Sequence, residues 1–195
     1  MQEEILAAVR SGDLTKLRLL LASGADLDAQ DPLGWSVLMW ASALNLPRVV
    51  RVLLENGADT EGTDQYGSTA LMKACRQDSI AIADLLLKYG ADIDAVDALG
   101  WTALMRAAHR GFEEIVQLLL EHFPQSEIAD HRGATALILA ASEGHATVTK
   151  QLLEWGADMH ATDINGKTAL TWAVSRGHSA VVDLLNEWQE RQDAE

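Results

Sequence analysis

Histidine and cysteine side chains supply many metal ligands and nucleophiles, and in this sequence they stand apart from one another. The six histidines are scattered along the second half of the chain, at His109, His122, His131, His145, His160 and His178. No two of them have the spacing that recognised metal sites use. The sequence also lacks a glycine-rich phosphate loop and a serine or cysteine elbow. It therefore predicts no catalytic residue, no cofactor and no metal.

Aspartate can also do acid–base chemistry, and here it recurs at a constant interval. Five aspartates lie 33 residues apart, at Asp31, Asp64, Asp97, Asp130 and Asp163. Each is followed three residues later by a glycine, which accepts the positive φ of a tight turn, while Asp bonds nearby backbone amides. We therefore interpret these aspartates as turn formers rather than acids. A period of this length indicates stacked structural repeats.

The residues after each turn predict two helices. A Ser or Thr stands where a helix N-cap belongs, ahead of an Ala-Leu run. These caps are Ser36, Thr69, Thr102, Thr135 and Thr168. Apolar residues then recur at helical spacing, Gly111, Gly144 and Gly177 follow the first helix, and a second apolar helix ends before the next turn. One such pair cannot cover its own apolar stripes, so the pairs must stack.

These motifs resemble the ankyrin repeat, whose pattern is Asp-x-x-Gly-x-Thr-Pro-Leu-His followed by Gly-His and Leu-Leu-x-x-Gly-Ala-Asp. Gly144-His145 and Gly177-His178 match the Gly-His, and Leu53 to Asp59 matches the closing segment. Ala replaces the family proline in four copies, and the Thr-Ala-Leu variants resemble those of bacterial members. The resemblance implies an all-α ankyrin-repeat solenoid of stacked helix-turn-helix units joined by β-turn or hairpin loops.

The resemblance covers the whole chain and implies one domain, 1–195, with six repeats counting the N-terminal cap. The cap is 1–30, the internal repeats are 31–63, 64–96, 97–129 and 130–162, and the C-terminal cap is 163–195. In the repeat 97–129 the expected closing Gly is Phe123 and the expected Ala is Pro124. Phe123 either covers core or is presented outward, and the first alternative is the better supported from the sequence.

Composition limits the compartment and the partners. The net charge of −14 argues against nucleic acid or an anionic membrane as partner. Cys75, the lone cysteine, excludes an internal disulfide and replaces a small helix Ala, which favours an inert core thiol. No apolar run approaches the roughly 20 residues of a membrane span. The acidic start, Met-Gln-Glu-Glu, differs from a secretory signal. We expect a cytoplasmic protein, monomeric apart from its partner.

The resemblance also implies where a partner binds, because ankyrin proteins use the turn tips and the exposed side of the first helices, which line a concave face. These positions hold seven of the fifteen basic residues, four of the six tryptophans and a single acid, Glu143. Aromatic residues and Arg are enriched at binding hot spots. The predicted partner-binding residues are Leu33, Trp35, Trp40, Tyr66, Lys73, Arg76, Leu99, Trp101, Arg106, His109, Arg110, Arg132, Trp172 and Arg176.

Two interpretations of this set remain open. In the first, the residues form a basic, aromatic groove on an acidic body, matched to a partner protein that presents acidic and apolar groups. In the second, the tryptophans pad the core and the arginines pair with turn aspartates. We expect a non-enzymatic protein-interaction module, acting as an adaptor, an inhibitor or an immunity-type protein. The alternatives are binding of nucleic acid or another polyanion through the basic stripe, or an enzymatic role that the motifs do not reveal.

Overall fold

The computed structural model describes residues 1–194, and Glu195 lies outside the described residues. The chain divides into two compact units, unit 1 (Met1–Ala98) and unit 2 (Leu99–Glu195). Among the described residues all regular structure is helical, apart from one isolated bridge between Gln30 and Ser36. This confirms the predicted all-α class. The prediction of one domain over 1–195 with six repeats stays a prediction.

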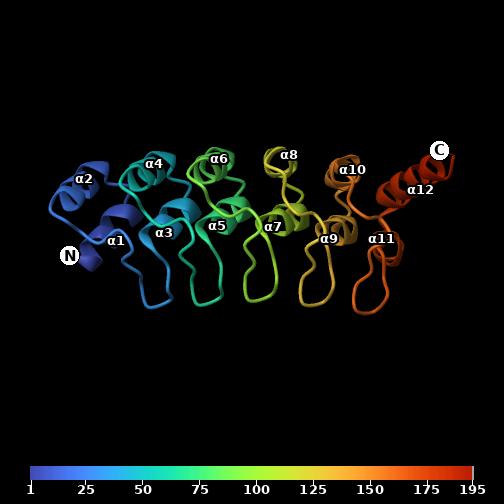
Figure 1. Ribbon diagram of the computed structural model, residues 1–195, viewed down its shortest axis with the longest axis horizontal. Coiled ribbons are helices and arrows are strands. Elements are labelled where there is room, and N and C mark those ends of the chain that lie inside the picture. The colour runs from blue at the N-terminus through green and yellow to red at the C-terminus, as the bar shows by residue number, and fades with distance from the viewer. Residues whose placement is uncertain (195) are drawn as a thin grey trace. The chain divides into compact units, whose positions relative to one another are not determined.

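Each unit contains three helix pairs. The helices of unit 1 are α1 (Gln2–Arg10), α2 (Leu14–Ala22), α3 (Val37–Ala43), α4 (Pro47–Glu55), α5 (Ala70–Arg76) and α6 (Ile80–Lys88). Those of unit 2 are α7 (Ala103–Arg110), α8 (Glu113–Glu121), α9 (Ala136–Glu143), α10 (Ala146–Trp155), α11 (Ala169–Arg176) and α12 (Ser179–Asp193). Within each unit the odd-numbered helices lie next to the extended turns, and the even-numbered helices lie on the other side (Figure 1).

The predicted N-caps start the first helix of each pair from α3 onward. The side-chain oxygens of Ser36, Thr69, Thr102, Thr135 and Thr168 each accept a hydrogen bond from the amide three residues later. Gly111, Gly144 and Gly177 then end the helix in the left-handed conformation. In unit 1, Asn45 and Asp78 take that conformation with φ of 53° and 55°, which their short polar side chains tolerate.

The core lies between neighbouring helix pairs of one unit. The repeated leucine is fully buried at Leu38 and Leu71 in unit 1 and at Leu104 and Leu137 in unit 2. Consecutive first helices contact each other, α3 with α5 and α7 with α9, and consecutive second helices do so as well. Burying such a leucine contributes roughly 1.5–3 kcal/mol. Each pair therefore obtains its stability from its neighbours, as expected for repeats that cannot fold alone.

The turns also stack on one another through the backbone. The Gln65 amide donates to the Leu33 carbonyl and the Ala98 amide to the Tyr66 carbonyl in unit 1. In unit 2 the equivalent bonds run from His131 to Leu99 and from Ile164 to Arg132, at 3.1 and 2.9 Å. These bonds bring each turn so close to the next that the glycine of one turn faces the backbone of its neighbour.

The loop after α8 departs from the other repeats. Pro124 is buried at the position that Ala58, Ala91 and Ala157 occupy elsewhere. Phe123 stands where the other repeats have Gly57, Gly90 and Gly156, and its side chain is 79% exposed. The favoured interpretation that Phe123 covers core is therefore wrong: the residue takes the left-handed conformation with φ of 56°, and its ring lies on the surface beside Trp155.

The stacking of turns predicts different costs for one substitution at two equivalent glycines. A Cβ on Gly133 would lie 3.0 Å from the Ile164 nitrogen, whereas a Cβ on Gly166 would meet nothing within 4 Å. Both have a positive φ, 74° and 70°, so both alanine variants lose about 1–2 kcal/mol. We expect Gly133→Ala to lose roughly 1–3 kcal/mol more, because the neighbouring backbone must shift. Urea unfolding measures both, and equal losses would contradict the stacking.

Candidate functional site

The leading aspartate of each turn uses its two carboxylate oxygens for different purposes. In Asp64, Oδ1 accepts hydrogen bonds from the amides of Tyr66 and Ser68, both at 2.9 Å. Asp31, Asp130 and Asp163 close their turns with the same two amides. This confirms the interpretation of these aspartates as turn formers. The second oxygen, Oδ2, remains available for a side chain.

A side chain of the following helix usually donates to that second oxygen. Nine residues after their aspartates, Trp40 and Trp172 donate their indole N–H to Oδ2 of Asp31 and Asp163, both at 3.0 Å. Lys73 occupies the equivalent position and donates its ammonium to Asp64 at 2.6 Å. The tryptophans and the lysine of this face are thus held in place by the turns that they support.

The repeat 130–162 lacks this donor and uses one from the preceding repeat. Leu139 stands at the position of Trp40 and Trp172 and has no N–H to offer. Trp101 instead donates its indole N–H to Oδ2 of Asp130 at 2.9 Å. Ala134 stands where the neighbouring repeats have Trp101 and Lys167. The small side chain of Ala134 and the apolar side chain of Leu139 therefore lie between Trp101 and Trp172.

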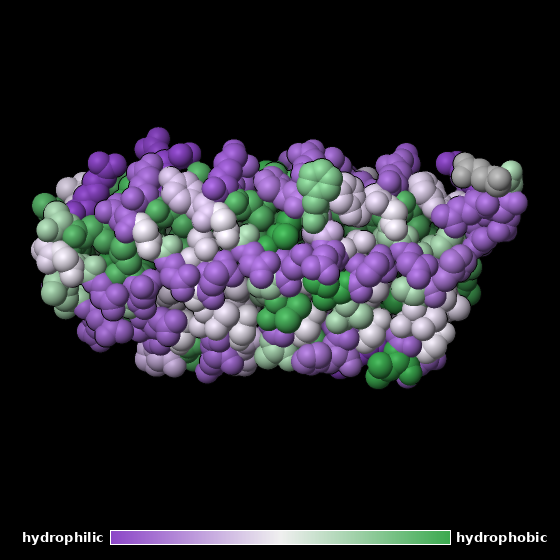
Figure 2. Space-filling model, in the orientation of Figure 1, coloured by the Kyte–Doolittle hydropathy of each residue, from purple (hydrophilic) through white to green (hydrophobic). Residues whose placement is uncertain are grey.

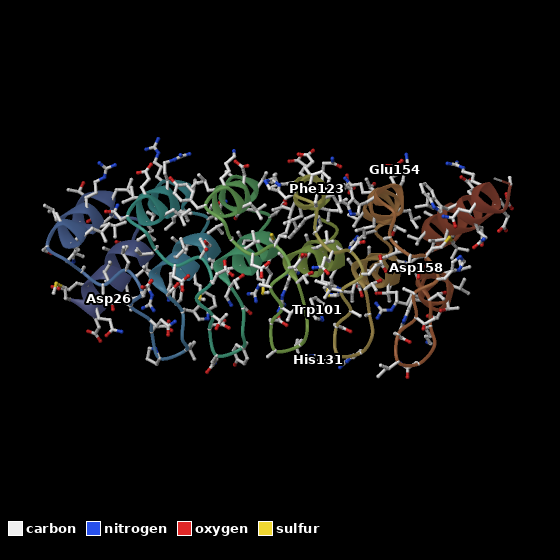
Figure 3. The ribbon with its side chains drawn as sticks, viewed as in Figure 1. Asp26, Trp101, Phe123, His131, Glu154 and Asp158 are labelled. Atoms are coloured by element: carbon white, nitrogen blue, oxygen red, sulfur yellow. The ribbon has the colours of Figure 1, made fainter. Side chains whose placement is uncertain are left out.

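A cavity of about 420 Å³ opens at this place in unit 2. Trp101 and Trp172 line it from the two flanking repeats, and Ala134, Ile138 and Leu139 line it from the repeat between them. The remaining lining residues are polar or lie near the turns: Leu99, His109, Asp130, His131, Arg132, Ser142, Glu143, Asp163, Asn165 and Arg176. Figure 3 shows Trp101 and His131 on the turn side of unit 2. The cavity is apolar inside and charged around its edge.

Most tryptophans of this face carry a cation on the ring. In unit 1, Arg10 lies 4.2 Å above Trp40 and Lys73 lies 4.2 Å above Trp35. In unit 2, Arg106 lies 5.1 Å from Trp101, and both Lys167 and Arg176 approach Trp172 at 4.2 and 5.3 Å. Such contacts are favourable by about 0.5–1 kcal/mol at exposed sites.

The structure distinguishes paired from unpaired arginines. Arg10 pairs with Asp31 at 3.1 Å, and Arg176 donates to the Glu143 carboxylate and to the Ser142 carbonyl. Arg76, Arg110 and Arg132 are exposed, and none of the three forms an ion pair with a described residue. Arg10 is thus the arginine that pairs with a turn aspartate, Arg176 pairs with a helix glutamate instead, and the basic, aromatic groove stays a prediction.

Lys73 corrects one expectation from the sequence. It was expected on the accessible face, but its side chain is 7% exposed and that of Asp64 is fully buried. The Trp35 ring covers its ammonium group, which serves the turn. The other predicted residues in unit 1 and unit 2 are exposed or half-buried, and six of them line the cavity: Leu99, Trp101, His109, Arg132, Trp172 and Arg176. Arg106 and Arg110 lie on the same face outside its lining.

Hydrogen bonding sets the protonation of the turn carboxylates. Burial alone raises the pKa of Asp64, but the bonds from Lys73 and from the Ser68 and Tyr66 amides outweigh it and hold the pKa below the ordinary 3.8. The pKa values of Asp31 and Asp163 are lowered for the same reasons. For His109 the effect of burial has the opposite sign, because the charged form of an imidazole is the protonated one. Burial lowers the pKa of His109 below 6.5, although Glu143 acts to raise it, so this imidazole is neutral at neutral pH.

The residues that create the cavity carry little signal in the sequence. Leu139 and Ala134 are ordinary helix and turn residues in isolation, and only their smaller volume relative to the same positions of neighbouring repeats indicates a hollow. Glu143, the only acid at the predicted positions, turns out to pair with Arg176. On the face shown in Figure 2, apolar residues over α7 to α12 form separate small patches among polar ones.

Comparison with known proteins decides the family. A family model described as ankyrin repeats, three copies, matches residues 5–97, 92–163 and 125–194. The chain belongs to the ankyrin repeat family. A search of curated proteins finds no significant match. The paired helices and stacked turns of both units agree with this assignment.

Ankyrin repeats generally act as protein-interaction modules, and proteins built from them are typically non-enzymatic. No helix within residues 1–194 is both long and apolar enough to cross a membrane. Over the same residues, no three histidine, cysteine, aspartate or glutamate side chains come together where they would hold a metal ion. Cys75 is fully buried, and burial raises the pKa of its thiol well above the ordinary value.

The buried ion pair in unit 1 predicts a graded response to substitution of Lys73. Lys73→Met leaves the Asp64 carboxylate buried without its donor and should destabilise the protein by about 3–5 kcal/mol. Lys73→Trp supplies the indole donor that this ankyrin protein uses at Trp40 and Trp172, so we expect less than half of that loss. Urea unfolding of both variants measures the difference. Equal destabilisation would show that donation to the aspartate is not what the position requires.

Proposed function

We propose that this ankyrin repeat protein is a non-enzymatic binding module for a partner protein that presents acidic and apolar groups. The observation that carries the proposal is the cavity of unit 2, with Trp101 and Trp172 on either side and the unpaired Arg132 among its lining residues. Such a site is compatible with an adaptor, an inhibitor or an immunity-type protein. We further propose a cytoplasmic location and a monomer apart from the partner.

The apolar part of the partner is inferred from the size and lining of the cavity. Sites for small molecules are concave, mostly apolar and about 300–1,000 Å³ in volume, and this cavity falls in the lower part of that range at about 420 Å³. Tryptophan and arginine dominate interface hot spots, most strongly in well-packed, desolvated pockets. The cavity therefore suits one bulky apolar or aromatic side chain.

The acidic part is inferred from the charges that lack partners. Asp130 and Asp163 are occupied by turn amides and indoles, and Glu143 by Arg176. Arg132 and Arg110 have no carboxylate of their own among the described residues. A carboxylate next to the inserted side chain would satisfy one of them with a charge-assisted bond. The net charge of −14 repels an extended polyanion such as nucleic acid.

Filling the cavity should abolish binding without unfolding the protein. Leu139→Trp places an indole where two other repeats already carry one, at Trp40 and Trp172. We expect at least a ten-fold weaker affinity for peptides selected on the wild type from a random 12-residue library. Those peptides should contain an aromatic or leucine residue flanked by Asp or Glu. Titration of labelled peptide gives the affinities.

Thr147→Trp, which adds the same side chain at an exposed position of α10, is the matched control and should bind as the wild type does. Selected peptides that lack acidic residues, or that bind Leu139→Trp unchanged, would contradict the proposal. Arg132→Glu should weaken the same peptides, whereas Arg48→Glu on α4 should not.

A further inference from the structure

Phe123 adopts a backbone conformation that a bulky residue rarely takes. Its φ is 56°, in the left-handed region that the other repeats fill with Gly57, Gly90 and Gly156. A bulky side chain there is a genuine outlier and costs stability. Proline follows at Pro124 and further restricts the backbone of the preceding residue. The fold alone would be served better by glycine at this position.

Burial does not compensate for this strain. At 79% exposure, Phe123 is the most exposed large hydrophobic residue of the described chain. Its ring contacts Trp155 at the end of α10, with centroids 5.4 Å apart and planes tilted by 54°. Figure 3 shows Phe123 with Glu154 on the α8 and α10 side of unit 2, away from Trp101 and His131. The Phe123–Trp155 pair is thus separate from the cavity.

The charges around the pair are acidic. Glu121 and Glu154 precede Phe123 and Trp155 closely in sequence and are exposed, as is Asp158. Helices α8, α10 and α12 together carry eight acidic residues and two basic ones, Lys150 and Arg191. Each of these two already pairs with a glutamate one turn away: Lys150 with Glu154 at 3.5 Å, and Arg191 with Glu187 at 3.7 Å. The surface therefore complements a positively charged partner.

Four tryptophans elsewhere in the molecule show how this chain pairs an aromatic ring with a cation. Trp35, Trp40, Trp101 and Trp172 each have a lysine or arginine over the ring. Neither Phe123 nor Trp155 has such a cation among the described residues. An arginine side chain supplies a planar guanidinium that stacks on an aromatic face and pairs with a neighbouring carboxylate.

We propose that the Phe123–Trp155 pair is a second docking site, which takes an arginine-bearing segment of a partner protein. The guanidinium stacks on the exposed ring of Phe123, and its charge is met by Glu121, which has no cation of its own among the described residues. With 79% of Phe123 exposed, its ring is accessible for this contact while it packs against Trp155. The site is independent of the proposed cavity function, and its partner has the opposite charge.

The test uses the whole chain and three labelled 12-residue peptides that alternate glycine with arginine, lysine or glutamate. We expect the arginine peptide to bind more tightly than the lysine peptide by three-fold or more, and the glutamate peptide not to bind. Phe123→Gly restores the residue of the other repeats, so it should fold at least as stably as the wild type by thermal unfolding. It should nevertheless bind the arginine peptide at least ten-fold more weakly.

Tyr89→Ala is the matched control, because Tyr89 occupies the repeat position of Trp155 in unit 1, where Gly57 of the preceding repeat stands in place of Phe123. This variant and Leu139→Trp should both bind the arginine peptide within two-fold of the wild type. Equal binding by the wild type and Phe123→Gly would reduce the effect to general charge attraction and overturn the proposal. Self-association of the wild type that Phe123→Gly abolishes would overturn it in favour of a second copy.

Discussion

The carboxylate of the leading aspartate is the group on which the rest of this ankyrin protein depends. One oxygen fixes the turn through two backbone amides, and the other fixes a side chain of the helix that follows. The aspartate thereby links the turn to the helix that follows it, which a glycine-rich turn alone would not do. Its lowered pKa in Asp31, Asp64 and Asp163 is the electrostatic consequence of those bonds.

The identity of the helix donor then shapes the surface. Where it is tryptophan or lysine, the donor fills the space above its own turn, as Trp172 and Lys73 do. Where it is Leu139, the aspartate takes Trp101 from the preceding repeat, and a cavity opens between the two indoles. In both cases Oδ2 of the aspartate receives a hydrogen bond, but only the arrangement with Leu139 leaves room for another molecule. Variation at one repeated position thus converts a structural contact into a binding surface without changing the fold.

The sequence predicts most of the fold because its signals are local and repeated five times. The Ser and Thr caps and the left-handed glycines are each decided within a few residues, and both are confirmed. What it does not predict depends on neighbours in space. Lys73 and Arg106 stand at the same repeat position, yet nothing local shows that Trp35 and Asp64 bury Lys73. To predict the cavity beside Leu139, one must compare the side-chain volumes at the same positions of adjacent repeats. To predict the exposed ring of Phe123, one must know that its backbone takes a conformation that aromatic residues rarely adopt.

Titration of the turn carboxylates by carbon-detected NMR tests this dependence most directly. If hydrogen bonds to the turns and helices hold these groups, Asp31, Asp64 and Asp163 will titrate below the ordinary 3.8. Because the pKa is lower in the folded state, the stability they contribute is complete above about pH 4. It is lost as the pH falls through the folded-state values. Carboxylates that titrate at or above 3.8 in the folded protein would contradict the account, since burial without those bonds raises the pKa.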